Sequence, residues 1–269
     1  MKYQLNGASQ VFNYLVFLRN GFLLILLFTT CFCSAQSLPN TQKDPVYLTG
    51  LKVDGKALEI ENKFQAYNKA IDAYYTLSND ENHLYLIVKI KYVEIVPKVL
   101  LGGITLTVNQ SKAKKDTAGL SITFPFLEAD DRGKVTNLYA TAQNERLEKE
   151  EKESDVTKLN AALKSGLKTI KVTGLPGVET PMISIYNEEG IRAAALFDKE
   201  LLLTYELSVP LTLLSSVKKG SNVFSYQIKV NSPYASTTPH VTNGPPPPPM
   251  MVSTTAVTDF RAEYKLAQK

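Results

Sequence analysis

The sequence Ala73-Tyr-Tyr-Thr-Leu-Ser-Asn-Asp-Glu-Asn-His-Leu-Tyr-Leu-Ile-Val-Lys-Ile90 decides the fold class of this chain. Aromatic and β-branched residues fill both of its ends, and the polar run Ser78–Asn82 separates them. In the second half apolar residues recur at every second position, which is the period of a half-buried strand. The pattern predicts a β-hairpin. A calcium loop is the alternative for the turn, because Asp80 and Glu81 supply oxygen ligands.

The same two-residue period recurs through the rest of the chain, with no helix pattern between most of the segments. Strands that follow one another without helices are typical of antiparallel sheets, and two such sheets packed together form a sandwich. The sequence therefore predicts an all-β fold, an antiparallel two-sheet β-sandwich that occupies residues 36–269 as a single domain. The predicted core includes one residue from each of five strands: Leu86, Leu106, Ile122, Leu207 and Ile228.

Two segments interrupt the β pattern. Residues 144–168 contain no proline, carry Glu–Lys pairs four residues apart and end with an apolar stripe, so they predict one helical insertion. Residues 232–258 contain five consecutive prolines, Pro245–Pro249, whose rings enforce an extended polyproline II backbone. They predict a Pro-rich loop that lies inside the domain, because the strand pattern 260–266 follows it.

The first 35 residues have the pattern of an export signal. Lys2 and Arg19 make the start positive, and an apolar run leads to the small residues before Gln36. The strongly apolar stretch of residues 22–33 is shorter than the ~20 residues that a membrane-spanning helix needs. The sequence therefore predicts a cleaved signal peptide over residues 1–35, no membrane span after cleavage, and an exported protein that is periplasmic, on the cell surface or secreted. A lipoprotein acylated at Cys31 or Cys33 is the alternative.

The composition excludes several classes of site. Both cysteines of the chain, Cys31 and Cys33, lie in the leader, so the exported protein would lack a thiol nucleophile, a disulfide or a zinc–thiolate centre. Two histidines, His83 and His240, are too few for a multi-histidine metal centre. The formal charge of +4 is too small for a nucleic-acid binder. We therefore expect no metal, no cofactor, no catalytic residue and no nucleic-acid partner.

Three short motifs carry a resemblance to a known family. They are Val53-Asp-Gly-Lys-Ala-Leu-Glu-Ile60, the hairpin already quoted, and Tyr205-Glu206-Leu-Ser-Val-Pro210-Leu211. In this order they resemble a family 9 carbohydrate-binding-like (DOMON-like) domain, as found in uncharacterised exported bacterial proteins. The likeness spans most of residues 47–267 and implies a β-sandwich. It also implies an exported, non-enzymatic carbohydrate-binding module.

The resemblance departs from the family at the ligand residues. Sugar-binding members hold a terminal sugar between tryptophans, whereas this chain has no Trp, and Ile60 stands where the opening motif has one. Tyrosine combines an apolar face with a hydroxyl and can replace such a ring. The ligand-binding candidates are the tyrosines at predicted loops or strand ends: Tyr67, Tyr186 and Tyr234. Of the adjacent pair Tyr74 and Tyr75, one must also point outward from its strand.

The expected partner is a glycan or oligosaccharide, and an envelope protein is the alternative partner. Stacking on one or two tyrosines predicts weak affinity, about micromolar to millimolar, that changes little with salt. Two other functions compete with this expectation. One is a structural or protein-interaction β-sandwich of the bacterial envelope without sugar binding. The other is a glycan hydrolase, since carboxylate pairs for that chemistry are set by three-dimensional spacing.

The leader generates the first testable prediction. Mass spectrometry of the protein recovered from the producing cell is expected to show a chain that begins at or near Gln36. An intact Met1 would contradict signal cleavage, and an acylated Cys31 or Cys33 would establish the lipoprotein alternative.

Overall fold

The protein is described by a computed structural model over residues 37–61, 63–109, 119–144, 146, 148–175, 177–178, 180–214, 222–231 and 256–269. Within these residues it is mostly β-structure. The strands are β1 Ala66–Asn68, β2 Ala73–Asn79, β3 His83–Ile90, β4 Ile104–Asn109, β5 Leu120–Phe126, β6 Thr169–Thr173, β7 Met182–Ser184, β8 Arg192–Phe197, β9 Leu203–Pro210, β10 Val223–Val230 and β11 Thr258–Lys265.

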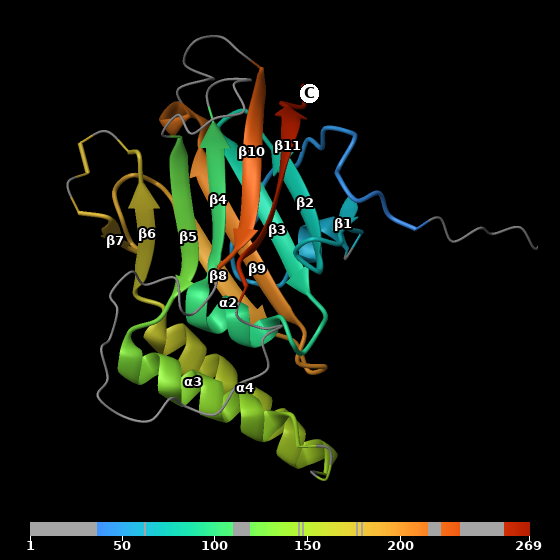
Figure 1. Cartoon of the computed structure of the whole chain (residues 1–269), viewed down its shortest axis with the longest axis vertical. Coiled ribbons are helices and arrows are strands. Elements are labelled where there is room, and N and C mark those ends of the chain that lie inside the picture. The colour runs from blue at the N-terminus through green and yellow to red at the C-terminus, as the bar shows by residue number, and fades with distance from the viewer. Residues whose placement is uncertain are drawn as a thin grey trace, which may run out of the picture. The chain divides into compact units, whose positions relative to one another are not determined.

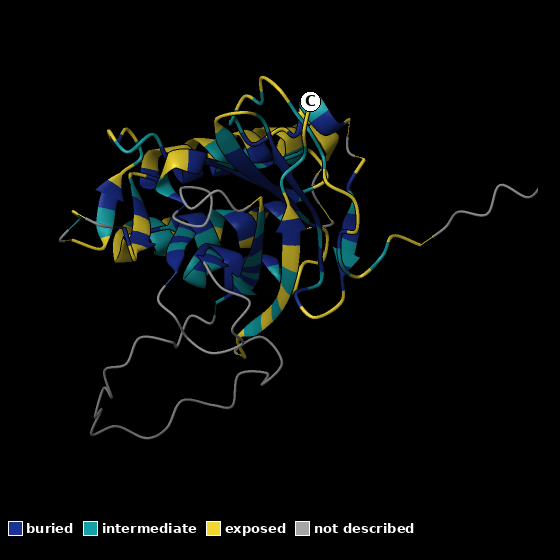
Figure 2. Cartoon of the chain, turned by 90° about the horizontal axis from the view of Figure 1, so that it is seen from above, coloured by how far each residue is buried: buried dark blue, intermediate teal, exposed yellow. Residues whose placement is uncertain are grey.

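The strands form two antiparallel sheets (Figure 1). One sheet has five strands in the order β1-β2-β3-β9-β8, and the other has six in the order β11-β10-β4-β5-β6-β7. Among the described strands the chain changes sheet between β3 and β4, between β7 and β8, and between β9 and β10, whereas β2 and β3 are joined by a short turn. Figure 2 shows buried segments within the strands and an alternation of exposed and less exposed residues along the edge strand β11. This arrangement confirms the prediction of antiparallel sheets and is consistent with a sandwich.

The predicted hairpin is confirmed, because β2 and β3 pair antiparallel along their length. The carboxylate of Asp80 folds the turn between them. Its Oδ1 accepts the backbone N–H groups of Asn82 and His83 at 2.7 Å each, and its Oδ2 accepts the Tyr85 hydroxyl at 2.6 Å. In the described part of the chain no group of three or more His, Cys, Asp or Glu side chains could hold a metal ion. Both oxygens of Asp80 therefore serve the turn, and nothing favours the calcium alternative.

The predicted core is also confirmed. All five residues named from the sequence are at most 1% exposed and belong to one hydrophobic cluster that contains residues of both sheets. Leu86 on β3 lies directly opposite Leu207 on β9 in the five-stranded sheet. In the six-stranded sheet Leu106 lies opposite both Ile122 and Ile228. The alternation therefore identified the inward face of each strand correctly.

Polar contacts join the two sheets inside this core. The hydroxyls of Tyr75 on β2 and Tyr226 on β10 lie 3.1 Å apart. At the end of β2, Asn79 Oδ1 accepts the Tyr264 hydroxyl at 3.1 Å and the Ala267 N–H at 2.8 Å. These bonds join β2 of the five-stranded sheet to β10 and to the C-terminal part of the chain at β11 in the six-stranded sheet.

The helices differ from the prediction. The described residues contain three α-helices, α2 Val96–Gly102, α3 Ala129–Ala142 and α4 Lys149–Gly166, and two 3₁₀ helices, η1 Leu58–Ile60 and η2 Leu211–Leu213. Helix α4 confirms the insertion predicted at 144–168. It begins later because Glu148 and Glu151 form a capping box.

The prediction of one helical insertion is wrong, since α2 and α3 are additional helices. Helix α2 has seven residues, too few to display a helical period. Helix α3 buries only Val135, Tyr139 and Ala142, so its apolar stripe is too sparse to stand out in the sequence. Its stability comes from packing beside α4, and Figure 1 shows the two helices side by side at one end of the sheets.

The five-stranded sheet is covered on its outer face as well, which the sequence did not predict. Strand β3 was expected to be half-buried, yet Ile87 on its outer face is fully buried. A second hydrophobic cluster forms there from Ala57, Ile60, Phe64 and Ile87, with Leu48 and Leu51 packed against it. The segment 48–64, which we call the covering segment, therefore lies on the outer face of this sheet.

A buried carboxylate fixes the covering segment in place. Glu206 on β9 is fully buried, and its Oε2 accepts the backbone N–H groups of Asp54 at 2.8 Å and Gly55 at 2.7 Å. Its Oε1 accepts the N–H of Ala57 at 2.7 Å. Gly55 has φ +84°, and a Cβ there would lie 2.7 Å from the Cβ of Leu196, so only glycine fits. The first and last motifs of the family resemblance are thus joined by direct hydrogen bonds.

Two sequence predictions fall outside the described residues. One is the signal peptide over residues 1–35, and the other is nearly all of the Pro-rich loop 232–258, of which only the end adjoining β11 is described. Among the described residues no helix is long and apolar enough to cross a membrane.

The core assignment generates a stability prediction. Leu106→Ala or Leu207→Ala is expected to lower the free energy of unfolding by about 2–5 kcal/mol, because each removes a buried side chain and leaves a cavity. Leu58→Ala is the matched control, since Leu58 is 65% exposed and its loss should change stability by less than about 0.5 kcal/mol. Urea denaturation measures all three. Equal losses at Leu58 and Leu207 would contradict the assignment.

The Glu206 contacts generate a second stability prediction. Glu206→Gln replaces one accepting oxygen by an NH₂ group, which cannot accept a backbone N–H and faces it as a second donor. We expect a loss of about 1–3 kcal/mol in urea denaturation. Glu200→Gln, which makes the same change at an exposed residue, should leave the midpoint unchanged. A midpoint shift shared by both variants would contradict the role of Glu206.

The loss of stability caused by Glu206→Gln should also depend on pH. Burial raises the pKa of Glu206 above its ordinary value of 4.5, and the three N–H groups only partly oppose this. Between the unfolded and the folded pKa the folded state binds more protons, so the stability of the native protein falls as the pH rises through that window. Gln has no proton to lose. The difference in the free energy of unfolding between the native protein and Glu206→Gln is therefore expected to be largest below about pH 4.5 and smaller above the window. A difference that widens as the pH rises would contradict this.

Candidate functional site

Part of the outer face of the five-stranded sheet remains open beyond the covering segment. There Tyr67 on β1 lies directly opposite Tyr74 on β2, which in turn lies opposite Lys89 on β3. Tyr75, the neighbour of Tyr74, is fully buried in the core, so Tyr74 points to the outer face. This confirms that one ring of the adjacent pair points outward. Three neighbouring strands thus place side chains in one line across the sheet.

Four aromatic rings gather at this open part, and we call Phe64, Tyr67, Tyr74 and Tyr92 the aromatic row. Ring centroids are 4.9 Å apart between Tyr67 and Tyr74, 6.0 Å between Phe64 and Tyr74, and 6.5 Å between Tyr67 and Tyr92. The ring planes are tilted by 43° to 57°, so the row is bent and not flat. Exposure rises along it, from buried Phe64 to Tyr92, which is 43% exposed.

Hydrogen bonding holds Tyr67 in the row. Its hydroxyl donates to Asp72 Oδ1 at 2.8 Å. Burial and the neighbouring Asp72 carboxylate raise the pKa of Tyr67, so its phenol stays neutral at physiological pH. Asp72 also interacts electrostatically with Lys98 on α2 and raises the pKa of that lysine, although burial lowers it more. The ring of Tyr67 is therefore fixed in orientation while part of it remains exposed.

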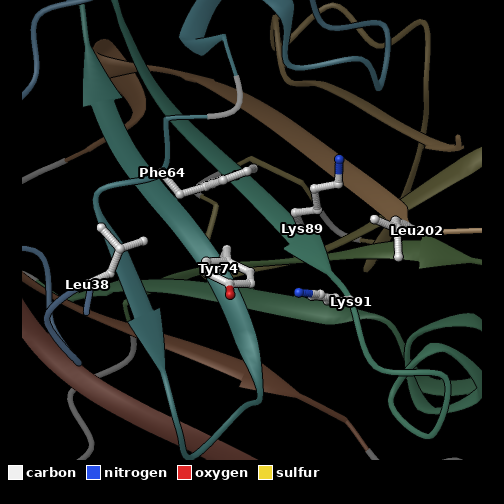
Figure 3. A pocket seen from close by; sticks show the side chains of 6 residues that line it. All are labelled: Leu38, Phe64, Tyr74, Lys89, Lys91 and Leu202. Atoms are coloured by element: carbon white, nitrogen blue, oxygen red, sulfur yellow. The ribbon is translucent and has the colours of Figure 1, made fainter. Parts of the chain in front are cut away.

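A depression of about 250 Å³ adjoins the aromatic row (Figure 3). It is lined by Leu38, Phe64, Tyr74, Lys89, Lys91 and Leu202. These residues come from the start of the described chain, the covering segment, β2, the end of β3 and the residue that follows it, and the turn before β9. Its volume lies just below the range of about 300–1,000 Å³ that is common for drug-sized ligands. The depression therefore suits one ring of a larger ligand that continues over the aromatic row.

Two lysines line the depression in different states. Lys89 Nζ lies 3.2 Å from Asp198 Oδ2. Asp198 Oδ1 in turn accepts the N–H groups of Glu200 at 3.1 Å and Leu202 at 2.9 Å. One carboxylate therefore both stabilises the turn and holds the ammonium group of Lys89. Lys91 is exposed and forms no ion pair with a carboxylate of the described chain. The site thus offers aromatic faces, a short apolar wall and an exposed ammonium group.

The structure brings one of the three tyrosines predicted from the sequence to this site. Tyr67 belongs to the aromatic row. Tyr186 is 84% exposed, but it follows β7 at the end of the other sheet and does not line the depression. Tyr234 lies outside the described residues.

Sequence reasoning did not assign Phe64, Tyr92 or Lys91 to the site. Phe64 and Tyr92 lie outside the strands, in connecting segments whose course cannot be obtained from periodicity. Lys91 directly follows β3, and no motif in the sequence singles it out. Tyr74 carried a usable signal, because adjacent aromatic residues on a strand must point to opposite faces. The feature that unites all of them is the adjacency of β1, β2 and β3.

Comparison with known proteins identifies no relative. No protein-family model, no curated protein and no solved structure matches this chain. What the chain does must therefore be inferred from its own residues and geometry.

Proposed function

We propose that the chain is an exported, non-catalytic carbohydrate-binding-like module that acts at a bacterial envelope or outside the cell. Its fold would be the two-sheet β-sandwich of the family 9 carbohydrate-binding-like (DOMON-like) domains, and its ligand an oligosaccharide held at the aromatic row. The observation that carries the proposal is the clustering of Phe64, Tyr67 and Tyr74 beside the depression on an uncovered part of a sheet.

The chemistry of the row supports a sugar ligand. Pyranose rings present apolar C–H faces that pack on aromatic rings, while their hydroxyls need polar partners at the edges. Tyr74 and Tyr92 provide part-exposed rings, and their phenolic hydroxyls can donate or accept. These tyrosines would take the place of the tryptophans that the family uses and that this chain lacks.

Packing supports the sandwich assignment. One hydrophobic core contains residues of both sheets, and the Tyr75 and Tyr226 hydroxyls meet between them. Glu206 accepts hydrogen bonds from the backbone of the segment Asp54–Ala57, so the first and last family-like motifs have one structural role in common. Export is supported by the leader pattern of residues 1–35, with the periplasm, the cell surface and the medium as the available compartments.

The rival functions predict different observations. A structural or protein-interaction module would leave the aromatic row without any glycan ligand. A hydrolase would consume a bound oligosaccharide. Glu206, the carboxylate whose pKa burial raises, is sealed from solvent and bound to three backbone N–H groups, so it does not favour an acid–base role.

The aromatic row generates a binding prediction. Tyr74→Ala and Tyr92→Ala are each expected to weaken oligosaccharide binding about fivefold, since each removes a stacking face worth about 1 kcal/mol. Tyr186→Ala is the matched control and should bind like the native protein, because Tyr186 follows β7 of the other sheet and does not line the depression. A glycan array on the purified protein identifies ligands, and NMR titration measures the dissociation constants.

Thermal melts separate binding from folding in this experiment. Tyr92 is the cleaner position, because it is 43% exposed and its loss should leave the melting midpoint almost unchanged. Binding that survives both Tyr74→Ala and Tyr92→Ala would contradict the assigned site. No response to any glycan at millimolar concentration would favour the structural module.

A further inference from the structure

Charge is distributed unevenly around the depression. Lys89 and Lys91 both line it, and Asp198 is the carboxylate that pairs with one of them. In Figure 3 the Nζ end of Lys91 is directed to the side of Tyr74, whereas that of Lys89 points away from this ring. An anionic group placed beside the Tyr74 ring would therefore meet Lys91 first.

The nearby carboxylates do not cancel the charge of Lys91. Asp198 is held by Lys89 and by two N–H groups of its own turn. Asp72, beside the aromatic row, accepts the Tyr67 hydroxyl and faces Lys98 electrostatically. Both carboxylates already have partners, and Lys91 makes no ion pair with any described acid. The open site thus keeps one uncompensated ammonium group next to its stacking ring.

We infer that the site selects acidic saccharides, namely glycans that contain hexuronate units. This inference rests on the proposed function and deepens it. The apolar C–H face of the sugar would pack on Tyr74, and the ring carboxylate would lie against Lys91 Nζ. A lysine acts as a point charge and does not demand the two-pronged geometry of an arginine, which suits an exposed and loosely oriented carboxylate.

The expected effect is modest because Lys91 is exposed. An exposed ion pair changes affinity by about two- to fivefold, and salt screens it. Binding of an acidic glycan should therefore weaken as salt rises, whereas binding of its neutral counterpart should not. This differs from the salt-insensitive binding that the sequence predicts from stacked tyrosines alone.

The test compares free-acid oligouronates with their methyl esters, which keep the sugar rings and remove the charge. Oligomers of galacturonate, glucuronate and mannuronate are titrated into the protein by NMR at about 0.02 M and about 0.5 M salt. The proteins are the native chain, Lys91→Gln and the matched control Lys171→Gln, whose lysine is exposed on β6 of the other sheet. We expect the native protein and Lys171→Gln to prefer the acid about two- to fivefold at low salt. Lys91→Gln should bind acid and ester equally.

The outcomes separate this inference from the proposed function. Equal affinity of native protein for acid and ester would overturn the acidic selectivity and leave glycan binding standing. An acid preference that persists in Lys91→Gln would overturn the role of Lys91. If no glycan of either kind binds, the proposed function fails and the inference fails with it.

Discussion

The carboxylate of Glu206 is the constraint on which the five-stranded sheet depends. A charge buried without a cation costs several kcal/mol unless hydrogen bonds satisfy it, and among the described residues Glu206 has three backbone N–H donors and no ion pair. Those donors belong to residues about 150 positions earlier in the chain. The covering segment must therefore follow the course that brings its N–H groups to Glu206. Any other course would leave the buried carboxylate without hydrogen-bond donors.

The hydrogen bonds between Glu206 and the covering segment also determine which part of the outer face is open to a ligand. The covering segment seals the centre of the outer face, where Ile87 and Glu206 lie, and Phe64 at its end packs on Tyr74. Beyond that contact the face is open, and the aromatic row and the depression begin. Because Tyr67 and Tyr74 lie on paired strands, these two rings keep their spacing without a large loss of conformational entropy on binding.

The second support of the site comes from the turn before β9. Asp198 closes that turn through the N–H groups of Glu200 and Leu202 and at the same time pairs with Lys89. Fixing Lys89 in this way leaves Lys91 as the exposed cation of the depression. The Asp198 carboxylate thus determines which lysine is exposed in the depression, just as the Glu206 carboxylate determines which part of the sheet is covered.

The sequence by itself indicated strands β2 to β5 and β9 to β11, the inward faces of five of them and the main helix, because side-chain period is a local property; it did not indicate β1, β6, β7 or β8. It also indicated that one of Tyr74 and Tyr75 faces outward. It failed for α2 and α3, whose patterns are too short or too sparse, and it treated β3 as half-buried. Only the tertiary structure decided that the covering segment buries the outer side of β3. It alone brought Phe64, Tyr67, Tyr74, Tyr92 and Lys91 together, because strand adjacency and loop course depend on contacts between distant residues, such as those of Glu206, that no local pattern encodes.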